Sequence, residues 1–198
     1  MKRSFDLLIA LIGLVVTSPV VLVAAMVVKL SSPGPAFYSG PRVGRNGAVF
    51  QIHKLRTMRV GADRSGPAIT AGGDTRVTSV GAWLRRTKAD ELPQLFNVFM
   101  GEMSLVGPRP EHPEFVKHYT AEQRSVLSVR PGMTGPTALA FIDEEKALGG
   151  NEPEATYLKV VMPAKLALDL DYVKTASFVG DLGILLKTAL VVVRRAFG

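Results

Sequence analysis

The 198-residue chain contains no cysteine, one tryptophan and only three histidines. The absence of cysteine excludes disulfides, thiolate zinc sites and a cysteine nucleophile, and it fits a domain that faces a reducing cytosol. The histidines, His53, His112 and His118, lack the spacing of a metal motif such as His-Glu-x-x-His. The composition therefore excludes thiol chemistry and offers no histidine metal motif.

The chain is long enough for one domain with a real core and short for two. Hydrophobic residues make up 47% of it, and its mean hydropathy is positive, which favours a membrane segment over a purely soluble enzyme. The formal net charge is +7, with lysine and arginine along most of the chain. This excess favours anionic partners, such as phosphates, nucleic acid or an anionic leaflet, without choosing among them.

An apolar segment from Phe5 to Val28 is long enough to cross a bilayer, which needs about 20 residues. Ser18-Pro19 lies near its middle, where proline removes a backbone hydrogen bond and predicts a kink. Basic residues, which cytoplasmic segments prefer, flank both ends: Lys2 and Arg3 before, Lys29, Arg42 and Arg45 after. A re-entrant helix that bends at Ser18-Pro19 keeps both flanks inside and is the favoured interpretation. A spanning anchor and a cleaved signal peptide are the alternatives.

The globular part begins after a break rich in Ser, Pro and Gly at residues 31–35. The β-prone runs Ala36–Val43 and Ala48–Met58 flank Arg45-Asn46-Gly47, and Asn-Gly between such runs predicts a β-hairpin. The stretch Gly61 to Asp74 is rich in Gly, Ala and Ser, which predicts a mobile loop. A short helix is expected at Val77 to Arg86.

Two helices have a clear apolar face. Leu92, Leu95, Phe96 and Phe99 recur at helical spacing, Pro93 fits only a first turn, and Gly101 is a plausible stop, so this helix should start near Asp90 and Glu91. Near the end of the chain a second stripe predicts an interfacial amphipathic helix, with a core-packing helix as the alternative. Its members are Leu182, Leu185, Leu186, Ala189, Leu190 and Val193.

The adjacent pair Asp90-Glu91 is the candidate for chemistry. In isolation, acidic residues at a helix start often only cap it. Basic residues change this interpretation if the fold gathers them around the pair: Arg85, Arg86, Lys88, Arg56, Arg109 and Arg130. An acidic pair in a cationic pocket suits diphosphate chemistry, in which cations and a metal hold phosphate oxygens while one carboxylate attacks phosphorus. The neighbouring carboxylate can then accept the proton of a second substrate.

A longer pattern around this pair resembles a known family. Residues 90–98 (Asp-Glu-Leu-Pro-Gln-Leu-Phe-Asn-Val) and 101–110 (Gly-Glu-Met-Ser-Leu-Val-Gly-Pro-Arg-Pro) look like the signature of the bacterial sugar transferases, the monotopic phosphoglycosyl transferases. Further pieces agree in order along nearly the whole chain: residues 2–6, Ser18-Pro19, 54–58, 74–78, 130–135, 169–172, 177–178 and 181–182.

The resemblance implies an enzyme of defined chemistry. Asp90 would attack the β-phosphate of a UDP-sugar, UMP would leave, and undecaprenyl (polyprenyl) phosphate would accept the phosphosugar, with Glu91 as base. The reaction would need Mg²⁺, with Asp90 as its protein ligand. The residues expected to hold substrate phosphates are Lys54, Arg56, Arg85, Arg109 and Arg130.

We therefore expect an α+β, mainly helical, monotopic membrane protein with a small β-hairpin and interfacial amphipathic helices. Residues 1–30 would form the re-entrant helix and 31–198 a membrane-associated catalytic domain on the cytoplasmic face of the bacterial inner membrane. A homo-oligomer is possible, and no nucleic-acid partner is expected. The alternatives are a non-catalytic, membrane-anchored phosphate- or lipid-binding module and a membrane-tethered nucleic-acid binder, which would need aromatics among its basic residues.

One stretch departs from the family pattern. Many members continue after Thr134-Gly135 with Trp-Ala-Gln-Val-Asn-Gly-Arg, whereas this chain reads Pro-Thr-Ala-Leu-Ala-Phe and then the acidic Asp143-Glu144-Glu145. Because this stretch is one that could contact the sugar or nucleotide, the resemblance does not identify the sugar.

Overall fold

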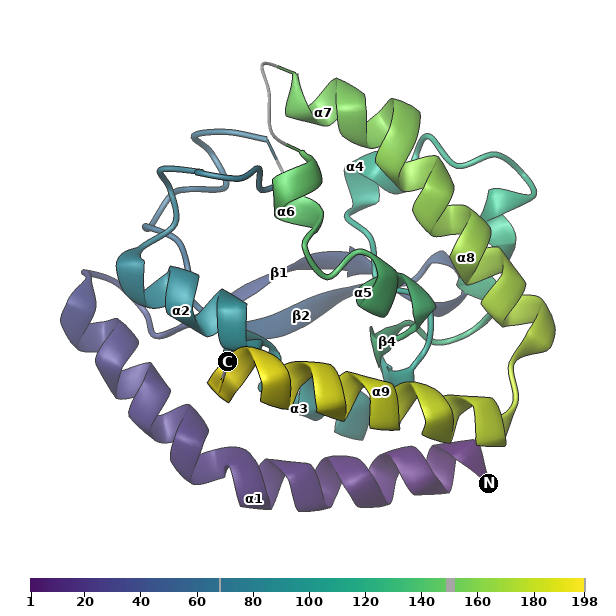
Figure 1. Cartoon of the computed structure of the whole chain (residues 1–198), viewed down its shortest axis with the longest axis horizontal. Helices are drawn as coiled ribbons and strands as arrows, with labels where there is room; N and C mark the ends of the chain where they lie inside the picture. The colour runs from purple at the N-terminus through teal and green to yellow at the C-terminus, as the bar shows by residue number, and fades with distance from the viewer. Residues whose placement is uncertain (68, 149–151, 198) are drawn as a thin grey trace.

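The computed structural model describes residues 1–67, 69–148 and 152–197 (Figure 1). Three parts of the sequence analysis fall outside the described residues. They are position 68 in the predicted loop, residues 149–151 in the divergent stretch, and residue 198 at the end of the predicted catalytic domain. The described part is mainly helical, which confirms the expected class. The helices are α1 (Lys2–Ser31), α2 (Ser79–Thr87), α3 (Gln94–Met100), α4 (Pro113–Val116), α5 (Pro136–Ala140), α6 (Glu144–Ala147), α7 (Pro153–Thr156), α8 (Met162–Thr175) and α9 (Phe178–Phe197).

The strands form two small sheets. β1 (Phe37–Val43) pairs antiparallel with β2 (Val49–Leu55), and the turn between them contains Asn46 at φ 57° and Gly47 at φ 80°, so the predicted hairpin is confirmed. β2 ends at Leu55, three residues before the predicted end. A second, parallel pair joins β3 (Ser104–Val106) to β4 (Gly132–Thr134) and was not predicted from the sequence.

Short turns of tighter or wider helix complete the chain. Three are 3-10 turns: η1 (Arg45–Gly47), η2 (Ala89–Glu91) and η3 (Gln123–Ser128). The fourth, η4 (Tyr157–Val161), is a π-helical turn that leads into α8. The predicted helix at Val77 to Arg86 is α2, displaced by one to two residues.

The apolar segment forms a single helix, α1, that remains continuous through Ser18 and Pro19. Figure 1 shows that it bends near its middle, so the expected break is a bend rather than an interruption of the helix. Of the described helices, α1 alone is long and apolar enough to cross a membrane, and only 6% of its most apolar window is buried.

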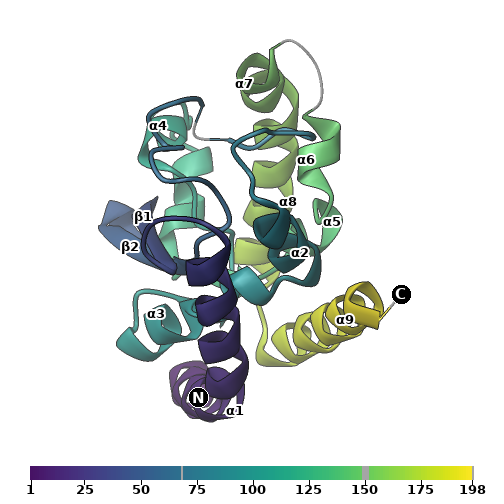
Figure 2. The same cartoon turned by 90° about the vertical axis from the view of Figure 1, so that its left-hand side faces the viewer.

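Both ends of α1 are fixed to the same globular body. Near its start, the buried carboxylate of Asp6 accepts hydrogen bonds from Ser104 Oγ at 2.7 Å and Leu105 N at 3.2 Å. Just beyond its last turn, the buried guanidinium of Arg56 donates to the carbonyl oxygens of Pro33 at 2.6 Å and Ser32 at 3.0 Å. The helix therefore passes beneath the body and returns to it (Figures 1 and 2).

The last helix, α9, lies along the same side of the molecule as α1 (Figure 2). Among its residues whose burial is described, only Asp181 is buried. Leu182, Leu186, Leu190 and Val193 form an exposed stripe, as expected of an interfacial helix, while Ile184 and Leu185 on the other face pack against the core. Exposed Phe96, Phe99 and Met100 of α3 add to this apolar side.

Candidate active site

A large open cavity of about 1810 Å³ lies above the apolar side of the molecule. Its walls come from the end of β2, the loop that follows, α2, η2, α5, α6 and the inner face of α9. Six of the seven residues predicted to be catalytic or to bind phosphate line this cavity: Asp90, Glu91, Lys54, Arg56, Arg85 and Arg109. The volume exceeds the 300–1,000 Å³ of an ordinary ligand pocket.

Asp90 and Glu91 lie in η2, between α2 and α3, rather than at the start of a regular helix. Lys88 takes the left-handed conformation (φ 58°) and ends α2, and Pro93 precedes the first residue of α3. No side chain caps α3 with a hydrogen bond, so neither residue of this pair acts as a capping residue for that helix.

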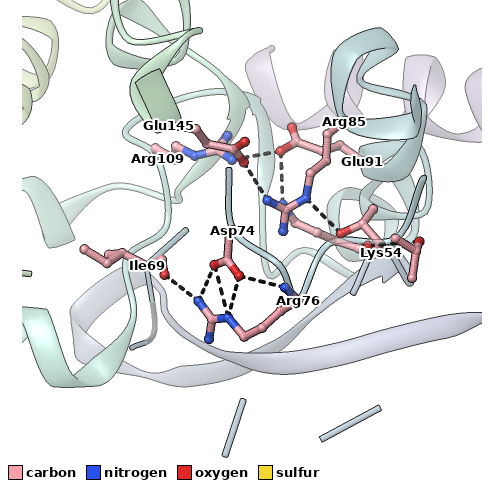
Figure 3. A network of polar contacts seen from close by, with 10 residues as sticks. Lys54, Ile69, Asp74, Arg76, Arg85, Glu91, Arg109 and Glu145 are labelled. Atoms are coloured by element: carbon pink, nitrogen blue, oxygen red, sulfur yellow. Dashed lines mark hydrogen bonds and ion pairs between the residues drawn. The ribbon is translucent and has the colours of Figure 1, made fainter. Parts of the chain in front are cut away.

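Glu91 is neutralised by two cations from distant parts of the chain. Its Oε1 lies 3.0 Å from Lys54 Nζ and 2.8 Å from Arg109 NH2 (Figure 3). Burial alone would raise the pKa of Glu91, but Arg109 and Lys54 hold it well below its usual range. Glu91 is therefore ionised throughout the physiological range.

Asp90 is in the opposite situation. Only 5% of the residue is exposed, and its buried Oδ1 has no hydrogen-bond partner within the described part of the chain. Burial raises the pKa of Asp90 to about 6, and Lys54 only partly offsets this effect. Asp90 lines the cavity, a ligand would displace no hydrogen-bond partner from this oxygen, and near neutral pH the carboxylate is mostly ionised.

Asn97, which we did not select from the sequence, holds the two sides of the site together. Its Nδ2 donates to Gln51 O of β2 and to Glu102 Oε2, both at 2.7 Å, and its Oδ1 accepts from His53 N at 3.0 Å. Because Lys54 follows His53 directly, this buried amide fixes the strand that presents the lysine to Glu91.

Arg85 extends from the last turn of α2 toward the cavity. Its Nε donates to Thr57 Oγ1 at 2.9 Å, and its NH1 lies 2.6 Å from Glu145 Oε1. The helix can approach Thr57 only because residue 81 is glycine: a Cβ atom there would lie 1.9 Å from the Thr57 carbonyl oxygen. Figure 3 shows Glu91 and Glu145 pointing toward the same group of cations.

Two predicted phosphate-binding residues are engaged elsewhere. Arg56 lines the cavity, but its terminal nitrogens donate to the carbonyl oxygens that follow α1. Arg130 is absent from the described walls of the cavity, and its Nε donates to Gly101 O at 2.8 Å. The geometry therefore lends no support to a phosphate role for Arg56, and the structure does not bring Arg130 to Asp90.

The far wall carries a polar cluster that we did not select from the sequence. Lys165 of α8 donates to Glu144 at 3.0 Å and to the Tyr157 hydroxyl at 3.1 Å, and that hydroxyl donates to Glu111. Tyr157 begins the π-helical turn η4, a type of distortion that is frequent at functional sites. The only feature of the sequence that pointed to this cluster was the acidic run that contains Glu144.

The described residues contain no group of three or more His, Cys, Asp or Glu side chains that could hold a metal ion. This does not conflict with Mg²⁺, which proteins commonly bind through one or two carboxylates together with substrate phosphates. Asp90, with its unpartnered Oδ1, fits the role of the single protein ligand. Such an arrangement of carboxylates and cations suits a transferase that handles phosphate groups.

Comparison with known proteins agrees with that class. The family model of the bacterial sugar transferases matches residues 1–195, and the chain belongs to this family of enzymes. The UDP-glucose:undecaprenyl-phosphate glucose-1-phosphate transferase of Caulobacter vibrioides is 41% identical over 190 residues, 94% of this chain and 67% of that protein. The exopolysaccharide production protein PSS of Rhizobium leguminosarum bv. phaseoli is 37% identical over 209 aligned positions, 100% of this chain and 98% of that protein.

A third relative matches more strongly over a shorter stretch. The putative undecaprenyl-phosphate N-acetylgalactosaminyl 1-phosphate transferase of Bacillus subtilis is 47% identical over 121 residues, which are 61% of this chain and 68% of that protein. The names of the Caulobacter and Bacillus relatives therefore give the same type of reaction with different sugars.

The buried Asp90 should lower stability at neutral pH. Because burial raises its pKa to about 6, the protonated form stabilises the fold at low pH, and this contribution is lost as the pH rises through about 6. Asp90→Asn should therefore increase the free energy of unfolding at pH 8 by on the order of 1–3 kcal/mol. The gain should shrink as the pH falls from 6 to 4. Unfolding curves of both proteins across this range test the prediction, and a gain that does not depend on pH would contradict it.

Proposed function

We propose that the chain transfers a sugar-1-phosphate from a UDP-sugar to undecaprenyl phosphate and releases UMP, the first membrane step in the synthesis of a glycan. The names of the relatives support the reaction, since they are transferases that act on undecaprenyl phosphate. The observation that carries the mechanism is a buried, unpartnered carboxylate oxygen on Asp90, within electrostatic reach of Lys54 and Arg109.

In the first half-reaction, the donor diphosphate lies among Lys54, Arg85 and Arg109. An oxygen of Asp90 forms a bond to the β-phosphorus while the bond from that phosphorus to the bridging oxygen breaks, and UMP leaves with the bonding electrons. Asp90 must be ionised to attack, so this step should slow as the pH falls below about 6. The cations offset the charge that develops on the phosphate oxygens.

In the second half-reaction, an oxygen of undecaprenyl phosphate attacks the same phosphorus, and the bond to Asp90 breaks. Glu91 accepts the acceptor's proton. In the substrate-free chain Lys54 and Arg109 make Glu91 a weak base, because they hold its pKa low. Once phosphate oxygens draw these cations away, the pKa of Glu91 rises and the residue becomes a better base.

Asp90 and the substrate's phosphate oxygens would hold Mg²⁺, which when bound would polarise the diphosphate and neutralise its charge. Arg85 and Arg109 supply further positive charge from the protein itself.

The membrane arrangement that we propose follows from α1. A straight helix of 30 residues would be about 45 Å long. Asp6 at one end and Arg56 beyond the other tie both ends to one body, so both lie on the same side of the bilayer. The bend near Pro19 then makes α1 a re-entrant helix, and the exposed stripe of α9 lies in the interface beside it. The basic residues that flank α1 support a catalytic domain on the cytoplasmic face of the bacterial inner membrane, because cytoplasmic segments prefer lysine and arginine.

UMP release tests the reaction. Purified protein with Mg²⁺ and undecaprenyl phosphate should release UMP from one or a few members of a panel of UDP-sugars. Asp90→Asn should reduce the rate at least 10³-fold because the nucleophile is lost. Glu91→Gln should slow the complete reaction while still allowing a single release of UMP without acceptor. Undiminished release by Asp90→Asn would remove Asp90 as the nucleophile, and no release from any donor would favour the phosphate- or lipid-binding module.

Cysteine labelling tests the re-entrant arrangement, because the natural chain has no cysteine. Ser4→Cys and Ser31→Cys place exposed thiols near the two ends of α1, and Val16→Cys places one, 68% exposed in the isolated chain, near the bend. A membrane-impermeant maleimide should label both end positions in inverted vesicles and neither in intact spheroplasts. Val16→Cys should react only after detergent is added. Labelling of the two ends from opposite sides would show that α1 spans the membrane.

A further inference from the structure

The divergent stretch carries three consecutive acidic residues, and each pairs with a cation from a different helix. All six side chains line the cavity that holds Asp90. The pairs are Asp143 with Arg195 of α9 at 2.7 Å, Glu144 with Lys165 of α8 at 3.0 Å, and Glu145 with Arg85 of α2 at 2.6 Å. The run therefore joins three walls of the cavity by electrostatic contacts.

Two of these pairs differ in how easily they can break. The side chains of Lys165 and Glu144 are 10% and 22% exposed, and Lys165 also donates to Tyr157, so this pair is held firmly. The side chain of Glu145 is 49% exposed and its partner Arg85 is 21% exposed. Ion pairs in contact with water contribute little to stability, so a stronger anion can replace Glu145 at little cost.

Arg85 is also the cation that a donor would need. Thr57 holds its Nε, while NH1, which faces Glu145, points into the cavity on the same side as Glu91 and Arg109 (Figure 3). Burial raises the pKa of Asp90, and Arg85 is among the cations that partly offset this rise, so Arg85 lies within electrostatic reach of the predicted nucleophile. The carboxylate of Glu145 would therefore compete for the Arg85 guanidinium with any diphosphate that binds next to Asp90.

We propose that Glu145 occupies Arg85 in the substrate-free enzyme and yields it to the diphosphate of the donor, so that Glu145 sets donor affinity. The proposal rests on the proposed function, because it takes Arg85 as a ligand of the donor phosphates. Glu144, fixed by Lys165, keeps the acidic run at the cavity wall throughout, so only the next side chain has to move. This exchange keeps Arg85 neutralised and oriented until the donor arrives.

The size of the effect follows from the strength of an exposed ion pair. Such a pair favours molecules in which Glu145 is bound to Arg85 only severalfold over molecules in which Arg85 is free. A ligand that needs free Arg85 has its intrinsic affinity multiplied by the fraction of molecules in which Arg85 is free. Removing the charge of Glu145 should therefore tighten donor binding by about two- to sixfold. The same change should not raise the KM for any donor, because Glu145 does not bind the substrate.

The experiment measures UDP binding by calorimetry, with Mg²⁺, on the full chain in detergent. UDP contains the diphosphate but no transferable sugar, so binding is separated from turnover. The variants are Glu145→Gln, Arg85→Gln and the double variant, with Glu154→Gln as the matched control. Glu154 is exposed and lines the same cavity, and it makes no ion pair among the described residues.

Glu145→Gln should bind UDP about two- to sixfold more tightly than the wild type, Glu154→Gln should bind as the wild type does, and Glu145→Gln should add nothing once Arg85 is replaced. Equal tightening in Glu154→Gln, or tightening that persists without Arg85, would show a general charge effect and overturn the proposal. Unchanged affinity in Glu145→Gln, in an enzyme that binds UDP and releases UMP, overturns this inference alone. A wild type that neither binds UDP nor releases UMP from any donor overturns the proposed function as well.

Discussion

Two carboxylates on adjacent residues repel each other, and the arrangement of the site follows from how the fold accommodates Asp90 and Glu91. Lys54 and Arg109 neutralise Glu91, at 3.0 and 2.8 Å, and leave Asp90 buried with an oxygen that has no partner among the described residues. The two pKa values therefore move in opposite directions from their usual range. Separation of this kind is how one site assigns different roles to two chemically similar groups.

The rest of the fold serves to bring these four residues together. Asn97 ties α3 to β2 and so places Lys54, while Gly81 lets α2 pack against the end of the hairpin. The contacts of Asp6 and Arg56 hold the ends of α1 beneath the same body. An exposed apolar helix and the cavity that holds Asp90 thus lie on adjoining sides of one small domain. This is the arrangement that a reaction between a water-soluble donor and a lipid acceptor requires.

Local features of this chain could be predicted from the sequence because they depend on neighbouring residues. Asn46-Gly47 predicts the hairpin, and the apolar spacing predicts α3 and α9. The parallel pairing of β3 with β4 and the Asn97 contacts join residues far apart in the chain, so no local pattern reveals them. Arg56 and Arg130 show the same limit, since a basic residue next to a motif does not reveal which group its guanidinium will contact. The role of Glu145 appears only once α2 and α6 are seen across one cavity.

The measurement that most directly tests the central claim is the mass of the enzyme after incubation with its UDP-sugar and Mg²⁺ in the absence of undecaprenyl phosphate. The account predicts that the protein gains the mass of one phosphosugar group, that this group maps to the peptide containing Asp90, and that adding undecaprenyl phosphate removes it. UMP released only when both substrates are present, from an enzyme that is never modified, would contradict the account. Such a result would indicate direct transfer from donor to acceptor.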